Sequence, residues 1–310
     1  MPGPRGQMDE MVVRTTALTK RYGKANALQA VDLEVPRGEV YGLVGQNGAG
    51  KTTLIRLLTG LARPTEGEVE LFGQGGAQLR RQRSRVGALI EAPALSLDLT
   101  ARQNLEALRI QRGLAGRHWV DEVLELVGLE QTGVKKARQF SLGMRQRLGI
   151  AVARLGRPEL LVLDEPVNGL DPTWMVRVRE ELVRRAHEDG TTVLLSSHLL
   201  AELDLFTTRY GFIHHGRLVR QLTAHELHEQ CRHSLRVVVD DPARACTVLE
   251  EGFGVRDYQV REGGELVVGS QLDQAAAINA ALVGAGLSVS RLDVQGASLE
   301  DYFTDLVKEA

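Results

Sequence analysis

The stretch GQNGAGKT, residues 45–52, stands between an apolar run, VYGLV, and a segment with helical spacing, TLIRLLTGL. It fits the pattern G-x-x-x-x-G-K-[ST], whose glycines let backbone amides turn towards phosphate oxygens. The start of the following helix adds its partial positive charge at the same place. A glycine-rich turn with a chance lysine is the alternative. The strand before the motif and the helix after it favour a loop that binds nucleotide phosphates.

We expect this loop to surround the phosphates with its own backbone and side chains. Lys51 would neutralise the β and γ phosphates, and the Thr52 hydroxyl would bind Mg²⁺. The predicted nucleotide-binding residues of the loop are Gly45, Gln46, Asn47, Gly48, Ala49, Gly50, Lys51, Thr52 and Thr53.

Two adjacent acids follow the short apolar segment ELLVLDEP, residues 159–166. Such a segment is typical of a strand buried on both faces of a parallel sheet. Asp164, at its end, would hold Mg²⁺ through water, and Glu165 is placed to orient or deprotonate an attacking water. A helix-capping pair of acids is the alternative. With the phosphate loop upstream, the pair predicts a nucleoside triphosphatase.

The rest of the chain alternates strands and helices, which predicts an α/β fold with a parallel core sheet. MVVRTTA, residues 11–17, predicts a strand, and residues 28–45 predict two more around a Pro-Arg-Gly turn. Residues 98–157 are mostly helical by their apolar spacing. From residue 222 the order βαββαβ and a final helix predict a small α+β, ferredoxin-like domain. The predicted domains are therefore 1–221 and 222–310.

Further motifs resemble, in order, the nucleotide-binding subunits of ABC transporters. They are LTKRYG with Tyr22, FSLGMRQRLGIA at 140–151, NGLDP with Asp171 and LLSSH with His198. The resemblance covers residues 11 to about 220. It implies the P-loop NTPase fold of an ABC ATPase, with an antiparallel β part and a helical subdomain at about 98–157. It also implies ATP and Mg²⁺ as ligands.

The resemblance assigns roles to these residues. Tyr22 would stack on adenine, His198 would contact the γ-phosphate, and Asp171 would lie in the D-loop at a dimer interface. Ser141 and Gly143 would approach the γ-phosphate held by a second copy of the chain. Leu142 and Met144 depart from the usual signature LSGGQ-x-Q-R, which bears on the strength of the ATP-bound dimer.

Glu91 is the one carboxylate in the apolar run RVGALIEAPALS, residues 85–96. An unpaired buried carboxylate is costly, so Glu91 must face water or a positive group. In the resemblance Glu91 takes the position of a glutamine that reaches Mg²⁺ and the attacking water. A carboxylate binds a hard cation at least as well as an amide oxygen does. A solvent-facing loop glutamate is the alternative.

Charge and composition restrict the partners. Residues 222–310 contain 7 Lys and Arg against 15 Asp and Glu, a balance of −8, whereas residues 1–221 carry +6. An acidic tail does not favour a nucleic-acid partner. Cys231 and Cys246 have the spacing of neither a zinc site nor a disulfide framework. No apolar run approaches the roughly 20 residues of a membrane span. We therefore expect a separate membrane permease, with this chain at the cytoplasmic face of the cell membrane.

The segments ALIEAPAL and SLEDYFTDLVKE, together with the signature, resemble exporters that give bacteria immunity to bacitracin and lantibiotic-type peptides. The expected function is the ATPase of a drug exporter that works as a homodimer. A motor for another cargo, such as lipid, and a soluble ABC ATPase acting on nucleic acid or ribosomes are the alternatives. Residues 222–310 would serve dimerisation or regulation.

Overall fold

The computed structural model describes residues 10–231, 234–261, 264–296 and 299–308. They form two compact units, the first ending at Ala224 and the second beginning at His225. Within the described residues, no helix is long and apolar enough to cross a membrane.

The first unit contains a six-stranded sheet in the order β10-β9-β4-β8-β7-β6. Its neighbours pair in parallel except for β10, which is antiparallel to β9. Every residue of the three central strands is buried, which explains their nearly continuous apolar sequences. The strands are β4 (Val40–Val44), β6 (Val86–Leu89), β7 (Leu160–Asp164), β8 (Thr192–Ser197), β9 (Arg209–His214) and β10 (Arg217–Thr223).

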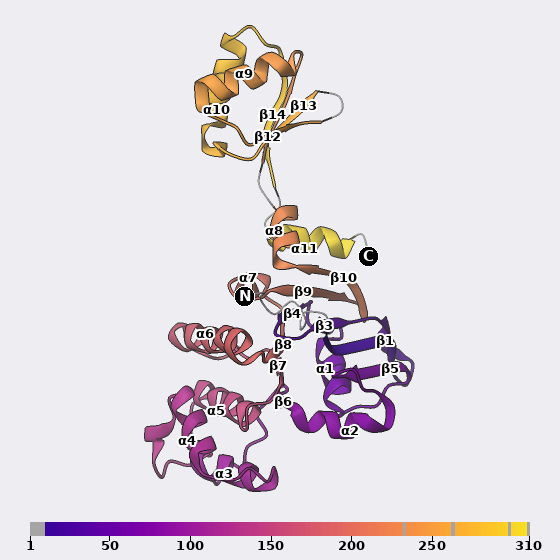
Figure 1. Cartoon of the computed structure of the whole chain (residues 1–310), viewed down its shortest axis with the longest axis vertical. Coiled ribbons are helices and arrows are strands. Elements are labelled where there is room, and N and C mark those ends of the chain that lie inside the picture. The colour runs from indigo at the N-terminus through magenta and orange to yellow at the C-terminus, as the bar shows by residue number, and fades with distance from the viewer. Residues whose placement is uncertain (1–9, 232–233, 262–263, 297–298, 309–310) are drawn as a thin grey trace, which may run out of the picture. The chain divides into compact units, whose positions relative to one another are not determined.

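A second, antiparallel sheet of the same unit is built around β1, which pairs with β2, β3 and β5. The helix after the phosphate loop, α1, contacts β2 and β5 of this sheet and β7 of the parallel sheet (Figure 1). Its apolar face is buried between them, while Thr52, Arg56 and Thr59 form a partly exposed polar stripe. These elements are β1 (Met11–Tyr22), β2 (Ala25–Val31), β3 (Glu34–Pro36), α1 (Lys51–Thr59) and β5 (Glu66–Leu71).

A helical segment lies between β6 and β7 in the sequence and forms its own cluster (Figure 1). Thr100 and Gln103 form a capping box at its first helix, and the Ser141 hydroxyl caps its last. The three main helices contact one another through buried apolar side chains. They are α3 (Ala101–Gln111), α4 (His118–Leu126) and α5 (Leu142–Arg154). The short helix α2 (Leu79–Gln82) precedes β6, and α6 (Pro172–Asp189) and α7 (Leu200–Asp204) flank β8 in the sequence.

Between α8 and α11, the second unit has the element order βαββαβ, with its sheet in the order β12-β13-β11-β14 and all pairs antiparallel. One face of the sheet carries the apolar core against α9 and α10. The elements are α8 (Ala224–Cys231), β11 (Ser234–Val239), α9 (Pro242–Phe253), β12 (Tyr258–Val260), β13 (Glu265–Val268), α10 (Ala275–Gly284), β14 (Val289–Gln295) and α11 (Leu299–Lys308). Among the described residues, Cys231 and Cys246 form no disulfide.

Candidate functional site

The phosphate loop leaves the carboxyl end of β4 and enters α1. Two of its glycines are required by the fold. A Cβ at Gly45 would lie 2.5 Å from the carbonyl oxygen of Ile213, and one at Gly50 would lie 2.8 Å from that of Ala27. Gly50 also has φ = 114°, a left-handed conformation that favours glycine. As the N-cap of α1, Gly50 offers no side-chain acceptor to the first amides of the helix.

Lys51 is 6% exposed and lies inside the loop. Its Nζ donates to the carbonyl oxygen of Gly45 at 2.5 Å and to that of Gln46 at 3.3 Å. The same ammonium is 3.5 Å from Glu165 Oε1. A buried cation needs such partners, and here they place its charge between the loop and the acid that follows β7.

Asp164, at the end of β7, receives two hydroxyl hydrogen bonds. Thr52 Oγ1 donates to Oδ2 at 2.8 Å, and Ser196 Oγ of the neighbouring strand β8 donates to Oδ1 at 2.5 Å. Both carboxylate oxygens are therefore fixed in direction. The arrangement brings a hydroxyl and a carboxylate together, which is the oxygen donor type that Mg²⁺ prefers.

Glu165 adopts φ = 48°, a left-handed conformation that is uncommon for a residue with a side chain. Its backbone amide donates to Ser196 Oγ at 3.1 Å. Its Oε2 lies 3.0 Å from His198 Nδ1, and its Oε1 faces Lys51. The carboxylate is thus held between a lysine and a histidine from two other segments of the chain.

Two cavities meet at these residues. The first, of about 210 Å³, is lined by Ala27, Gln46, Asn47, Gly48, Gly50, Lys51, Thr52, Thr53 and Glu165. The second, of about 380 Å³, is lined by Thr52, Glu91, Ala92, Pro93, Leu142, Gln146, Asp164, Glu165 and Asn168. Thr52 and Glu165 line both, so the phosphate loop and the acids after β7 face one continuous site. A polar loop of amides beside a lysine, a hydroxyl and two carboxylates is suited to a nucleoside triphosphate.

Known proteins resemble this chain in sequence and in fold. Residues 28–168 match the family model described as ABC transporter. The chain is 39% identical over 297 residues to a bacitracin transport ATP-binding protein, BcrA, of Bacillus licheniformis, covering 96% of this chain and 97% of that protein. The chain belongs to the ATP-binding proteins of ABC transporters.

Two further similarities extend this assignment. The chain is 39% identical over 202 residues to a lantibiotic transport ATP-binding protein, SrtF, of Streptococcus pyogenes, covering 65% of this chain and 86% of that one. Its fold matches a dimeric ATP-binding cassette in a post-hydrolysis state bound to ADP and Pi, with a TM-score of 0.64 and 27% identity over 68% of this chain and 98% of that one. The protein is accordingly an ABC ATPase that hydrolyses ATP, and the predicted P-loop fold is confirmed.

Glu91 lies two residues beyond β6, at the start of the loop that leads to α3, and lines the second cavity. Its Oε1 accepts a hydrogen bond from Arg56 of α1 at 2.7 Å. The Glu91 side chain is 58% exposed, and its backbone has φ = 55°. The sequence left water or a positive group as the surroundings of this acid, and the structure gives it both: an arginine of the cassette and solvent.

The remaining predicted residues lie outside the phosphate cavity and have structural contacts of their own. Ser141 accepts the amide of Met144 as the cap of α5, and Asp171 accepts that of Trp174 as the cap of α6. A Cβ at Gly143 would lie 2.9 Å from the carbonyl oxygen of Gly169. Tyr22 is half exposed at the end of β1, with Lys20 Nζ 4.9 Å from its ring centroid.

Two residues of the cassette were missed by the sequence analysis. Ser196 contacts both Asp164 and the amide of Glu165, and its signal was a polar residue in the buried strand that precedes His198. Gln146, 6% exposed in α5, donates from Nε2 to the carbonyl oxygen of Pro166 at 3.1 Å. It thereby connects the signature helix to the segment that carries Glu165.

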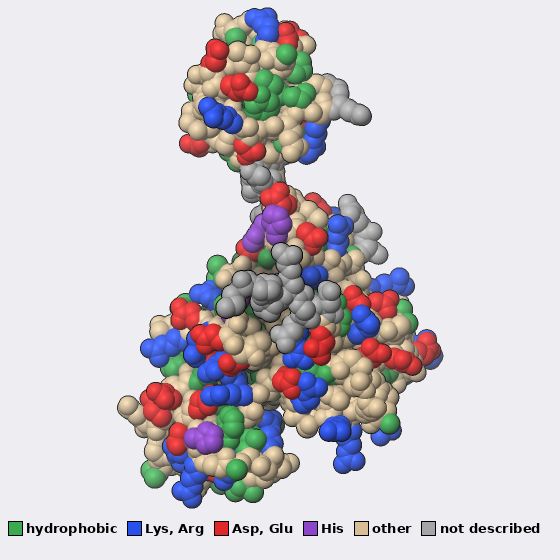
Figure 2. Space-filling model, in the orientation of Figure 1, with side chains coloured by type: hydrophobic (Ala, Val, Ile, Leu, Met, Phe, Trp, Pro, Cys, Tyr) green, Lys and Arg blue, Asp and Glu red, His purple; other side chains and the backbone are tan. Residues whose placement is uncertain are grey.

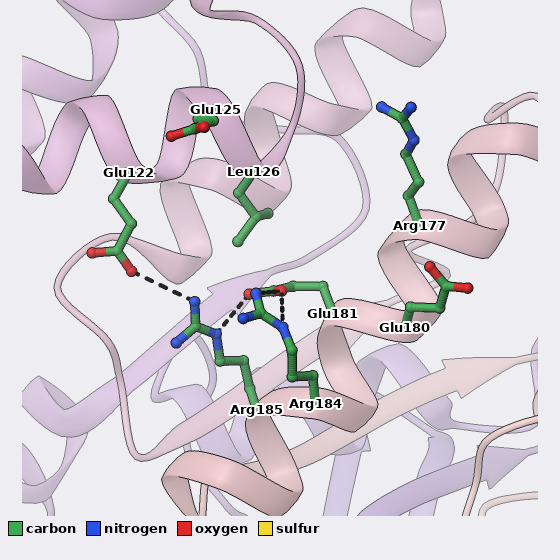
Figure 3. A pocket seen from close by; sticks show the side chains of 8 residues that line it. All are labelled: Glu122, Glu125, Leu126, Arg177, Glu180, Glu181, Arg184 and Arg185. Atoms are coloured by element: carbon green, nitrogen blue, oxygen red, sulfur yellow. Dashed lines mark hydrogen bonds and ion pairs between the residues drawn. The ribbon is translucent and has the colours of Figure 1, made fainter.

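A larger cavity, of about 480 Å³, lies between α4 and α6 and gathers none of the predicted site residues (Figure 3). Several of its charged side chains form ion pairs. Arg185 contacts Glu181 at 2.7 Å and Glu122 at 3.7 Å, and Glu122 also pairs with Arg157 at 3.0 Å. These ion pairs connect the helical segment to the core of the cassette.

Proposed function

We propose that this cassette is the motor of an exporter for peptide antibiotics or related drugs, and that it drives a separate membrane permease by hydrolysing Mg-ATP. The observation that supports it most is the convergence of Lys51, Thr52, Asp164, Glu165 and His198 around one site. The cargo class rests on the likeness to the bacitracin protein, which extends over nearly the full length of both chains.

The residues present fit a bound Mg²⁺. Within the described part of the chain, no three His, Cys, Asp or Glu side chains are grouped to hold a metal by themselves. A Mg²⁺ ion here would therefore use the Thr52 hydroxyl, Asp164 through water, and oxygens of the nucleotide. When bound, it would neutralise charge on the β- and γ-phosphate oxygens. Ser196 would keep the Asp164 carboxylate directed to that position.

Glu165 would orient the attacking water and accept its proton, because its carboxylate lies beside the phosphate loop. His198 would hold Glu165 through the 3.0 Å contact and reach the γ-phosphate. Lys51 would exchange its loop carbonyl partners for phosphate oxygens, which compensate a buried ammonium better. Lys51 and the loop amides would thus supply part of the positive charge that the transferred phosphoryl group needs.

The site would be completed by a second copy of the chain. Ser141 and Gly143 begin α5 outside the phosphate cavity of their own chain, which leaves them available to the ATP of a partner. Asp171 would contribute to the same interface. Tyr22, half exposed at the end of β1, would stack on adenine. The neighbouring fold is a dimer bound to ADP and Pi, in keeping with this assembly.

The permease would carry the cargo at the membrane, with this chain at its cytoplasmic face. We place the ATP-binding domain at 1–221, its helical subdomain at about 98–157, and an accessory domain for dimerisation or regulation at 222–310. A soluble ATPase acting on nucleic acid is less well supported. On the face in Figure 2, Lys and Arg side chains alternate with Asp and Glu rather than forming a continuous basic surface.

The test is to tag the full chain in its own cells, solubilise the membranes gently and identify what co-purifies. We expect a multi-helix membrane protein in constant ratio, and an ATPase activity that changes when bacitracin or a lantibiotic is added. A soluble complex without a membrane protein would contradict the exporter while leaving the ATPase intact. A permease that responds only to other drugs or lipid would contradict the cargo class.

A further inference from the structure

We propose that Arg56 is a positioning residue for the metal site: it holds the Glu91 carboxylate one helical turn away from Thr52 and releases it when Mg-ATP binds. The inference rests on the proposed Mg²⁺ site and adds to it a residue outside the motifs. Arg56 lies in α1, in the helix that begins at the phosphate loop, and its guanidinium is bound to Glu91 at 2.7 Å.

The positions of Thr52 and Arg56 in α1 mean that the Glu91 carboxylate has only a short way to move from Arg56 to the metal site. Thr52 and Arg56 are four residues apart, so their side chains lie on the same face of the helix with about 5–6 Å between Cβ atoms. Both belong to the partly exposed stripe of α1. Glu91 already lines the same cavity as Thr52, Asp164 and Glu165. A side-chain rotation, with a small loop movement, would bring its carboxylate from Arg56 to the metal position.

Charge explains why the carboxylate is held away. Asp164 and Glu165 already place two acids at the site, and a third would be repelled in the absence of a cation. Arg56 gives Glu91 a partner outside that cluster. When a divalent cation arrives with ATP, the repulsion becomes attraction, and a carboxylate is a favourable ligand for it.

The Arg56–Glu91 ion pair is weak enough for Glu91 to leave it for a metal ion. The Arg56 and Glu91 side chains are 38% and 58% exposed, and such pairs contribute little because water screens them. Glu91 also lies two residues beyond β6, near the start of the loop that leads to the helical segment. Its transfer would therefore couple metal binding to movement of the loop that joins the core to α3.

The experiment measures Mn²⁺ affinity by electron paramagnetic resonance on the full chain, with a non-hydrolysable ATP analogue present. The variants are Arg56→Met, Glu91→Gln and the double variant. Arg14→Met is the matched control, because Arg14 makes an exposed ion pair with Glu34 at 3.1 Å on the antiparallel sheet. We expect Arg56→Met to tighten Mn²⁺ binding by about threefold to tenfold, and Arg14→Met to leave it unchanged.

The double variant separates positioning from bulk charge. If Arg56 acts through Glu91, its substitution has no effect in the Glu91→Gln background. An equal effect in both backgrounds would mean that Arg56 only repels the cation, and would overturn the inference. Unchanged Mn²⁺ affinity in Arg56→Met would overturn it too. Mn²⁺-independent binding of the ATP analogue by the wild-type chain would instead refute the proposed metal site itself.

Discussion

His198 Nδ1 lies 3.0 Å from Glu165 Oε2, so the histidine after β8 contacts the acid after β7 directly. The contact joins two residues that are 33 positions apart and follow neighbouring parallel strands. It fixes the direction of a carboxylate whose backbone has φ = 48°. Strained conformations of this kind persist only where surrounding contacts stabilise them, and they are frequent at catalytic sites.

Glu165→Gln should retain ATP binding and lose most turnover. The amide keeps the size of the side chain but cannot accept the proton of the attacking water, and a positioned base is worth about 10²- to 10⁴-fold. The measurement is phosphate release together with ATP affinity on the same preparation. Full ATPase activity in this variant would remove Glu165 from the proposed role.

Lys51→Ala should lower ATP affinity by at least about 100-fold, since two charge-assisted contacts with phosphate are lost. Binding is measured by calorimetry, with thermal unfolding to check the fold. Lys136→Ala is the control, because it removes the same charge from an exposed position in the helical segment. Unchanged affinity in Lys51→Ala would contradict the phosphate-loop assignment.

Ser196→Ala should reduce turnover by roughly 10- to 100-fold, the usual effect of removing a group that orients a ligand residue. It leaves Asp164 Oδ1 and the amide of Glu165 without their hydroxyl partner. We also expect a rise in the Mg²⁺ concentration that gives half-maximal activity, which a purely structural loss would not cause. Ser197→Ala is the matched control, because this neighbouring buried hydroxyl accepts the amide of Leu199. Equal losses in both variants would count against a role for Ser196.

Local motifs explain why the centre of the site was predictable from sequence. The phosphate loop and the Asp164–Glu165 pair are made of consecutive residues, so their geometry follows from a strand end and a helix start. The buried strands were visible as short apolar runs. Ser196 was not visible in this way, because its place opposite Asp164 depends on the register between β7 and β8.

Other features depend on contacts distant in sequence. The pairing of Arg56 with Glu91 joins a helix and a loop 35 residues apart. The strand predicted over 11–17 continues to Tyr22, because β5 pairs with β1 on both sides of Ala17 and β2 pairs with β1 from Leu18 onward. Ala17 has φ = 48° and Ala30 has φ = 46°. A short stretch of sequence does not contain the partner strands, so it predicts neither their pairing with β1 nor the left-handed backbone at Ala17.

An ion-pair cluster at the edge of the parallel sheet gives a pH-dependent contribution to stability. Glu159, just before β7, accepts two hydrogen bonds from Arg85 at 2.6 Å and one from Arg37 at 3.3 Å. The Arg85 hydrogen bonds lower the pKa of Glu159 below its ordinary value of 4.5. The Arg85 guanidinium also lies 3.7 Å from the ring centroid of Phe72, so the cluster joins the two sheets of the cassette.

Because the folded state lowers this pKa, the stabilisation is complete above the ordinary pKa and is lost as the pH falls through the lower, folded value. Glu159→Gln should therefore lower the free energy of unfolding by about 1 kcal/mol at pH 7, allowing for the exposure of the pair. The difference from wild type should shrink below pH 4.5. Urea unfolding at pH 7 and at several pH values below 5 measures this difference in the free energy of unfolding. Glu66→Gln is the control, because Glu66 forms an exposed ion pair with Arg21. A deficit that stays constant into acid would show that the carboxylate's charge is not what stabilises this edge.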